Sequence, residues 1–166
     1  MAEKEKKDES SLNKLKNSYN SLKSKYNLPE FKVLNENFEI EGLSGDETDI
    51  LLKKIRKQLM EKVFFNIRTL ETFLNPSNAP LFIFNIIKTF TEADKALISS
   101  LYKQMSVYEV ESFGLEAKYS EEGEAKLIKQ IWSEWPKISE ALDSLYKSIK
   151  TNYNQESKKQ SKSYFG

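Results

Sequence analysis

The chain's candidates for chemistry are carboxylates, lysines and aromatic side chains, because the sequence has neither cysteine nor histidine. Their absence excludes disulfides, thiol nucleophiles, imidazole bases and the usual zinc sites. The glycines form no phosphate-binding loop, and no run of Asp or Asn has the spacing of a calcium-binding loop. We therefore expect a protein that is not an enzyme and has no cofactor and no metal site.

Carboxylates can still act as an acid and base pair or bind Mg²⁺. The best-placed are Asp46, Glu47 and Asp49 in the first turn of a predicted long helix, followed by Glu109 and Glu111. We favour a structural explanation, because acids at helix starts are ordinary caps and acids on exposed faces are solvated. A wider acidic group surrounds Lys118 and comprises Glu109, Glu111, Glu116, Glu121, Glu122 and Glu124. We favour an internal complement to the basic helices or plain solvation, and the alternative is a docking surface for a basic partner.

Positive charge is densest in a cluster that we name the basic patch: Lys53, Lys54, Arg56, Lys57 and Lys62. On a helix, Lys53, Arg56 and Lys57 share one face, where they could contact phosphates or an acidic partner. The favoured interpretation is a solvated outer face of an amphipathic helix. The lysines within residues 14–25 would enlarge the patch if they folded beside it.

Aromatic side chains are the third group. Trp132 and Trp135 are three residues apart, so both can lie near one side of a helix, where core packing is favoured and partner recognition is the alternative. Phe82, Phe84 and Phe90 lie in a short apolar segment after two prolines. If that segment is not fully covered, it is the best candidate for an exposed hydrophobic patch.

The elements that must position these residues all have helical periodicity. Near the start, a narrow stripe consists of Leu12, Leu15, Tyr19, Leu22 and Tyr26, with the spacing of a helix that packs along one seam. A helix of this composition is marginal alone, so the stripe must lie against something. The bundle's own surface is favoured, and a second copy or another protein are the alternatives.

Further helices follow from stop and start signals. Pro29 begins a short helix with Phe31, Leu34 and Phe38 on one face, and the chain breaks at residues 42–45. A capping box of Ser44 and Glu47 precedes a long helix that ends near Asn75, and Pro80 opens a short one that ends near Phe90. Thr91 with Asp94 caps a helix that stops at Gly114, and Ser120 opens the last helix. That last helix keeps its apolar stripe through Pro136, which predicts one kinked helix.

Two stretches, residues 28–40 (LPEFKVLNENFEI) and 131–136 (IWSEWP), resemble those of a group of small, functionally uncharacterised, all-helical archaeal proteins. The resemblance covers most of the chain and implies an all-helical fold. It implies no activity and transfers no functional residue.

Length and composition fit a single domain, with 166 residues, 39% hydrophobic residues, 31% charged residues and a net charge of +1. We predict an all-α bundle of about four to six helices over residues 10–152, with disordered termini at 1–9 and 153–166. No secretory signal and no membrane span are visible, so a cytoplasmic location is the default. The favoured function is a non-catalytic module that binds another protein or its own copy. The alternative is a nucleic-acid-associated protein that uses its Lys-rich helix faces.

Overall fold

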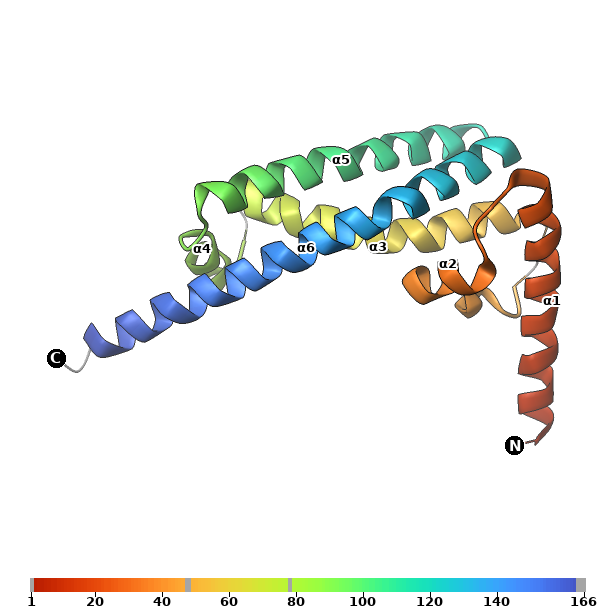
Figure 1. Ribbon diagram of the computed structural model, residues 1–166, viewed down its shortest axis with the longest axis horizontal. Coiled ribbons are helices and arrows are strands. Elements are labelled where there is room, and N and C mark those ends of the chain that lie inside the picture. Colours follow the sequence, from red (N-terminus) through yellow and green to blue (C-terminus); the bar gives the residue numbers. More distant parts are fainter. Residues whose placement is uncertain (1, 47–48, 78, 164–166) are drawn as a thin grey trace. The chain divides into compact units, whose positions relative to one another are not determined.

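The computed structural model describes residues 2–46, 49–77 and 79–163, with side chains described for residues 10–46, 49–77 and 79–156. Over these ranges the chain is an all-α helical bundle with six α-helices, one short 3-10 helix and no strand, which confirms the predicted fold class. The elements, in chain order, are α1 (Ala2–Tyr26), α2 (Phe31–Phe38), η1 (Ile40–Leu43), α3 (Leu51–Leu74), α4 (Leu81–Ile87), α5 (Glu92–Ala117) and α6 (Glu121–Ser163) (Figure 1). No helix of the described residues is long and apolar enough to cross a membrane.

The contacts within the chain divide it into two compact units. Unit 1 consists of residues 1–64 and 108–134, and unit 2 consists of residues 65–107 and 135–166. The helices α1, α2 and η1 therefore belong to unit 1 and α4 belongs to unit 2, while α3, α5 and α6 each supply one segment to each unit. The domain boundaries drawn from the sequence stay a prediction.

The core of unit 1 forms where α1, α2, α3, α5 and α6 turn apolar side chains inward. Tyr19 of α1 is fully buried, and its hydroxyl donates a 2.8 Å hydrogen bond to the carbonyl oxygen of Pro29. Its ring meets that of Phe31 edge to face at 5.4 Å, which holds α1 against α2. The segments of α3, α5 and α6 complete the core with Ile55, Leu59, Val63, Tyr108, Ile128 and Ile131, all at most 1% exposed.

Unit 2 is built from the remaining segments of the same three long helices, α3, α5 and α6, together with α4. The sequence stripe of α6 is buried here as predicted, with Trp135 at 3% exposure and Ile138 at 1%. Phe73 near the end of α3 packs edge to face with Phe90, at 5.2 Å between ring centroids. The remaining buried side chains include Ile67, Leu70, Ile98, Leu101, Met105, Leu142 and Leu145.

Local sequence signals explain where α5 and α6 begin. The Thr91 hydroxyl accepts a hydrogen bond from the backbone N–H of Asp94, and the Asp94 carboxylate accepts one from the N–H of Thr91, so the predicted cap forms. The Ser120 hydroxyl caps α6 by accepting from the N–H of Gly123. The helix α6 continues through Pro136 as one element, which confirms the prediction of a single helix rather than two.

Two predicted boundaries are wrong. The helix predicted to stop at Gly114 continues to Ala117, because Gly114 does not take the left-handed conformation that ends a helix and its carbonyl oxygen accepts the N–H of Lys118. The long third helix begins at Leu51 rather than directly after Ser44. Gly45 has a φ of +95° and the N–H of Asp46 bonds to the carbonyl of Leu43, so turns occupy this stretch. Glu47, the other half of the predicted capping box, lies outside the described residues.

The helical backbone extends into both segments for which the sequence predicts disorder. The helix α1 begins at Ala2 and α6 ends at Ser163. The side chains of residues 1–9 and 157–166 lie outside the described part of the chain.

Candidate interaction surfaces

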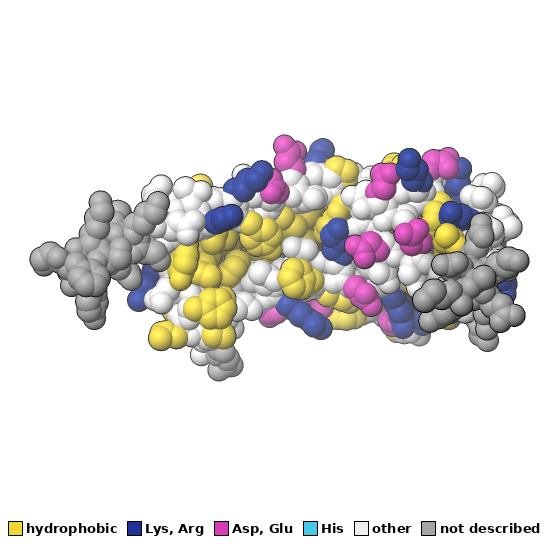
Figure 2. Space-filling view, turned by 90° about the horizontal axis from the view of Figure 1, so that it is seen from below, with side chains coloured by type: hydrophobic (Ala, Val, Ile, Leu, Met, Phe, Trp, Pro, Cys, Tyr) yellow, Lys and Arg dark blue, Asp and Glu magenta, His cyan; other side chains and the backbone are white. Residues whose placement is uncertain are grey.

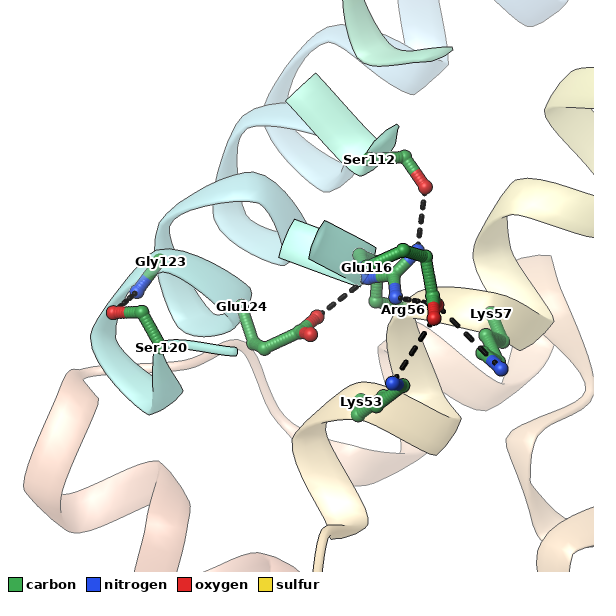
Figure 3. Close-up of polar contacts among 8 residues, drawn as sticks. All are labelled: Lys53, Arg56, Lys57, Ser112, Glu116, Ser120, Gly123 and Glu124. Carbon is green, nitrogen blue, oxygen red and sulfur yellow. Dashed lines mark hydrogen bonds and ion pairs between the residues drawn. The ribbon is translucent and has the colours of Figure 1, made fainter. Parts of the chain in front are cut away.

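Arg56 of α3 is the centre of a buried ionic cluster in unit 1 (Figure 3). Its Nε donates a 2.6 Å hydrogen bond to Oε2 of Glu124 on α6. Its two terminal nitrogens donate to the hydroxyl of Ser112 and to a carboxylate oxygen of Glu116, both on α5. One guanidinium thus ties three helices together, which uses the planar fork of Arg in a way that Lys cannot reproduce.

Glu124 is the unusual member of this cluster, because its side chain is fully buried. Its second oxygen, Oε1, is buried without a hydrogen-bond partner among the described residues. Burial raises the pKa of the Glu124 carboxyl, against the lowering effect of the hydrogen bond from Arg56. Such a carboxylate is stabilised chiefly by the guanidinium of Arg56 and is costly to leave buried without it.

Glu116 forms ion pairs with the other two residues of the predicted basic face, Lys53 and Lys57. Its carboxylate accepts from Lys53 at 3.0 Å and lies 3.5 Å from the Nζ of Lys57, in addition to its bond with Arg56. Hydrogen bonds from Arg56 and Lys53 lower the pKa of Glu116 to about 2. The sequence correctly places Lys53, Arg56 and Lys57 on one helix face, but that face is turned towards an acid of the same chain.

The other two residues of the basic patch are also engaged. Lys54 lies 3.4 Å from a carboxylate oxygen of Asp46. Lys62 donates to the carbonyl oxygen of Asn37 at 2.7 Å and sits over the ring of Phe38. All five residues of the patch thus have partners within unit 1.

The stripe of α1 lies partly against the same chain. Leu15 and Tyr19 are buried, whereas Leu12, Leu22 and Tyr26 are half-buried. At its end, the Tyr26 hydroxyl donates to Glu121 of α6 at 2.7 Å, and Lys129 donates to the Tyr26 carbonyl at 3.0 Å. These contacts account for the centre and the end of the stripe within unit 1.

The carboxylates singled out for chemistry do not gather into one site. Asp46 and Asp49 are exposed in the turns before α3, and Asp46 is paired with Lys54. Glu109 is half-buried and Glu111 exposed, both on α5. Among the residues that the structure describes, no three acidic side chains are grouped as metal ligands would be.

An uncovered apolar helix is the main feature of unit 2. The helix α4 has the sequence LFIFNII, and none of its seven residues is buried. Leu81 is 78% exposed and Phe82 is 57% exposed. The sequence marks Phe82 as an element of a possible patch, whereas Phe84 is half-buried and Phe90 is buried. We name the exposed side of this helix, which carries Leu81 and Phe82, the α4 surface.

The surroundings of the α4 surface are polar and carry both signs of charge. Figure 2 shows hydrophobic side chains gathered over α4 and the later part of α6, with lysine and arginine side chains around them. A polar recess in the same unit begins at the residue after α4; it is lined by Lys88, Thr89, Thr91, Asn152, Gln155 and Glu156. An apolar centre with a mixed polar rim is the usual composition of a protein interface.

A second exposed apolar face lies on the unit 1 segment of α5. Val110 is 68% exposed and Phe113 is 58% exposed. The periodicity of the sequence does not reveal this face, because α5 has apolar residues on opposite sides and the assumed stop at Gly114 hides its end. The available signal is that Val110 and Phe113 fall outside the stripe formed by Leu101, Met105 and Tyr108.

The chain matches no protein-family model, no curated protein and no solved structure.

Proposed function

We propose that this protein is a non-catalytic helical module that binds another protein through the α4 surface. The observation that carries the proposal is an apolar helix without a buried residue, with Leu81 and Phe82 the most exposed of its apolar side chains. Exposed apolar area of this kind is costly in water, and in folded proteins it marks a surface that another molecule covers.

The charges around α4 favour a protein over a lipid surface as the partner. A membrane-binding helix has a predominantly basic polar face that meets anionic lipid. The rim here combines Lys88 with Glu156, and Glu92 follows at the start of α5. Mixed charge of this kind suits a partner whose own rim has both signs.

The ion pairs of the basic patch favour this function over nucleic-acid binding. Binding to a nucleic-acid backbone requires side-chain cations that are free to contact the phosphates and displace their counterions. Lys53, Arg56 and Lys57 already share Glu116, and Arg56 is nearly inaccessible. The patch therefore offers little free positive charge to a phosphate backbone.

Photocross-linking from one defined position tests the proposal. Phe82 is replaced by a photoreactive phenylalanine in cells that express the protein, and Lys95, an exposed residue of the same unit, is replaced in the matched control. We expect discrete cross-linked protein products at position 82 that are absent at position 95 and unaffected by nuclease. Equal products at both positions, or an adduct that nuclease digests, would contradict the proposal.

A further inference from the structure

We infer that the exposed face of α5 in unit 1 is a docking surface for a basic amphipathic helix of another protein. This surface is distinct from the α4 surface, and the inference rests on the proposed function only in treating the chain as a protein-binding module. We name it the α5 surface and define it by Val110, Phe113, Gly114 and Ala117.

Helical geometry places these four residues together. At about 100° per residue they fall within an arc of roughly 100°, opposite the buried side chains of Tyr108 and Ser112. All four are exposed, and a Cβ built on Gly114 would meet no atom within 4 Å. The face is therefore apolar, continuous and open.

Gly114 is otherwise unexplained. It lies inside a helix, has no positive φ and has no neighbour that requires a missing side chain. A glycine at such a position weakens a helix relative to alanine. With Ala117 one turn further on, it lets the backbone of a second helix approach closely, as small residues do where helices cross.

The charges beside the face define the chemistry of the partner. Glu109 flanks the apolar arc on one side and Glu111 on the other, as 100° steps around the helix show. The exposed Lys118, directly after α5, falls on the Glu111 side, so the flanks carry two acids against one base and are net acidic. Glu111 is exposed, and neither acid takes part in an ion pair among the described side chains. A helix with apolar residues on one face and Lys or Arg beside them complements this arrangement. A second copy of the same surface would bring its own acidic flanks, so charge favours a foreign basic helix.

The test uses a synthetic helical peptide of leucine and lysine at amphipathic spacing, with a matched peptide in which glutamate replaces lysine. Binding to the full chain is measured by fluorescence anisotropy at low and physiological salt. We expect the lysine peptide to bind and the glutamate peptide to bind at least about tenfold more weakly, since opposite charge is favoured and like charge is penalised. Equal binding of both peptides, or no binding, would overturn the inference.

Variants locate the binding site. Phe113→Ser and Gly114→Gln should each weaken binding of the lysine peptide by about tenfold or more, as loss of a central anchor does. Gly114→Gln should not lower the melting temperature, because glutamine is a better helix former, so its loss of binding cannot come from unfolding. Glu111→Gln should weaken binding and reduce its salt dependence, whereas the control Glu36→Gln on α2 should change neither.

Two outcomes separate this inference from the proposed function. Lysine-peptide binding that is lost in a Leu81→Ser variant but retained in Phe113→Ser would place the helix on the α4 surface and overturn the α5 assignment. Sedimentation that shows a dimer abolished by Phe113→Ser would assign the α5 surface to a second copy instead. The first result would leave the proposed α4 function standing, since it places a partner there, and the second does not bear on the cross-linking expected at position 82.

Discussion

At the scale of single residues, the ionic cluster around Arg56 decides how the positive charges of α3 are used. Arg56 bonds to Glu124, Glu116 and Ser112 while being almost inaccessible to solvent. A buried charge pair contributes little net stability compared with apolar side chains, but it becomes costly when one partner is removed. This asymmetry can be measured.

Replacing Arg56 by Met should lower the free energy of unfolding by about 3–5 kcal/mol, because it leaves the buried carboxylate of Glu124 without its cation. The double variant Arg56→Met with Glu124→Leu should recover most of that loss, because no unpaired charge remains buried. Urea denaturation of the parent, both single variants and the double variant gives the coupling energy. Additive losses would show that the two side chains are not paired as described.

Glu116 predicts a defined pH dependence. Its pKa of about 2 in the folded chain lies below the ordinary value of 4.5. A carboxyl group whose pKa is lowered by folding stabilises the folded state at pH values above its ordinary pKa. That stabilisation is lost as the pH falls towards the pKa of the folded chain. Glu116 is 40% exposed, so we expect only about 1 kcal/mol.

The measurement compares the parent with Glu116→Gln by urea denaturation from pH 6 to pH 2. The parent should be the more stable at pH 6, and the difference should shrink between pH 4.5 and pH 2. A difference that stays constant over this range would show that the ion pairs of Glu116 do not stabilise the fold.

At the scale of elements, the stripe of α6 is the best test of the predicted helix register. Trp135 is 3% exposed, whereas Trp132 on the same helix is only half-buried. Trp135→Ala should lower the free energy of unfolding by about 3–5 kcal/mol, as large cavities in cores do. Trp132→Ala is the matched control and should cost clearly less. Melting curves that rank the two variants in the opposite order would mean that the register is wrong.

Periodicity also shows what sequence can and cannot reveal here. The α6 stripe and the cap of α5 at Thr91 and Asp94 follow from spacing and local hydrogen bonding, so both were predictable. The helix end predicted at Gly114 is wrong, because the presence of a glycine in the sequence does not reveal whether its φ is positive. The ion pairs of Arg56 join residues 60 and 68 positions apart in the chain, a proximity that no local pattern contains.

At the scale of the whole molecule, the exposed apolar surfaces are the feature that the folding of the chain alone does not explain. The α4 surface could be suspected from its composition, because its phenylalanines follow two prolines. Its exposure could not be predicted, since coverage depends on how distant helices pack. The neighbour of the α1 stripe could not be predicted either. The sequence allows the bundle's own surface, a second copy or another protein, and in the structure the stripe packs on α2.

Deleting residues 1–27 should leave a folded helical protein of lower stability, because the deletion removes the contacts of Tyr19 with Pro29 and of Tyr26 with Glu121. Circular dichroism melting and sedimentation across concentrations check this. A full-length monomer whose truncation melts at an unchanged temperature would show that α1 contributes nothing to its own fold, and that its stripe serves a foreign partner.

The most direct test of the central claim, that α4 is a surface kept open for a partner rather than a part of the core, is the stability of the double variant Leu81→Ser with Phe82→Ser. Both side chains are mainly exposed, so the free energy of unfolding from urea denaturation should stay within about 0.5 kcal/mol of the parent, as for other surface substitutions. Phe90→Ser, at a buried residue that packs on Phe73, should cost several times more and shows that the assay detects lost packing. A loss in the double variant comparable to that of Phe90→Ser would place α4 in the core and contradict the account.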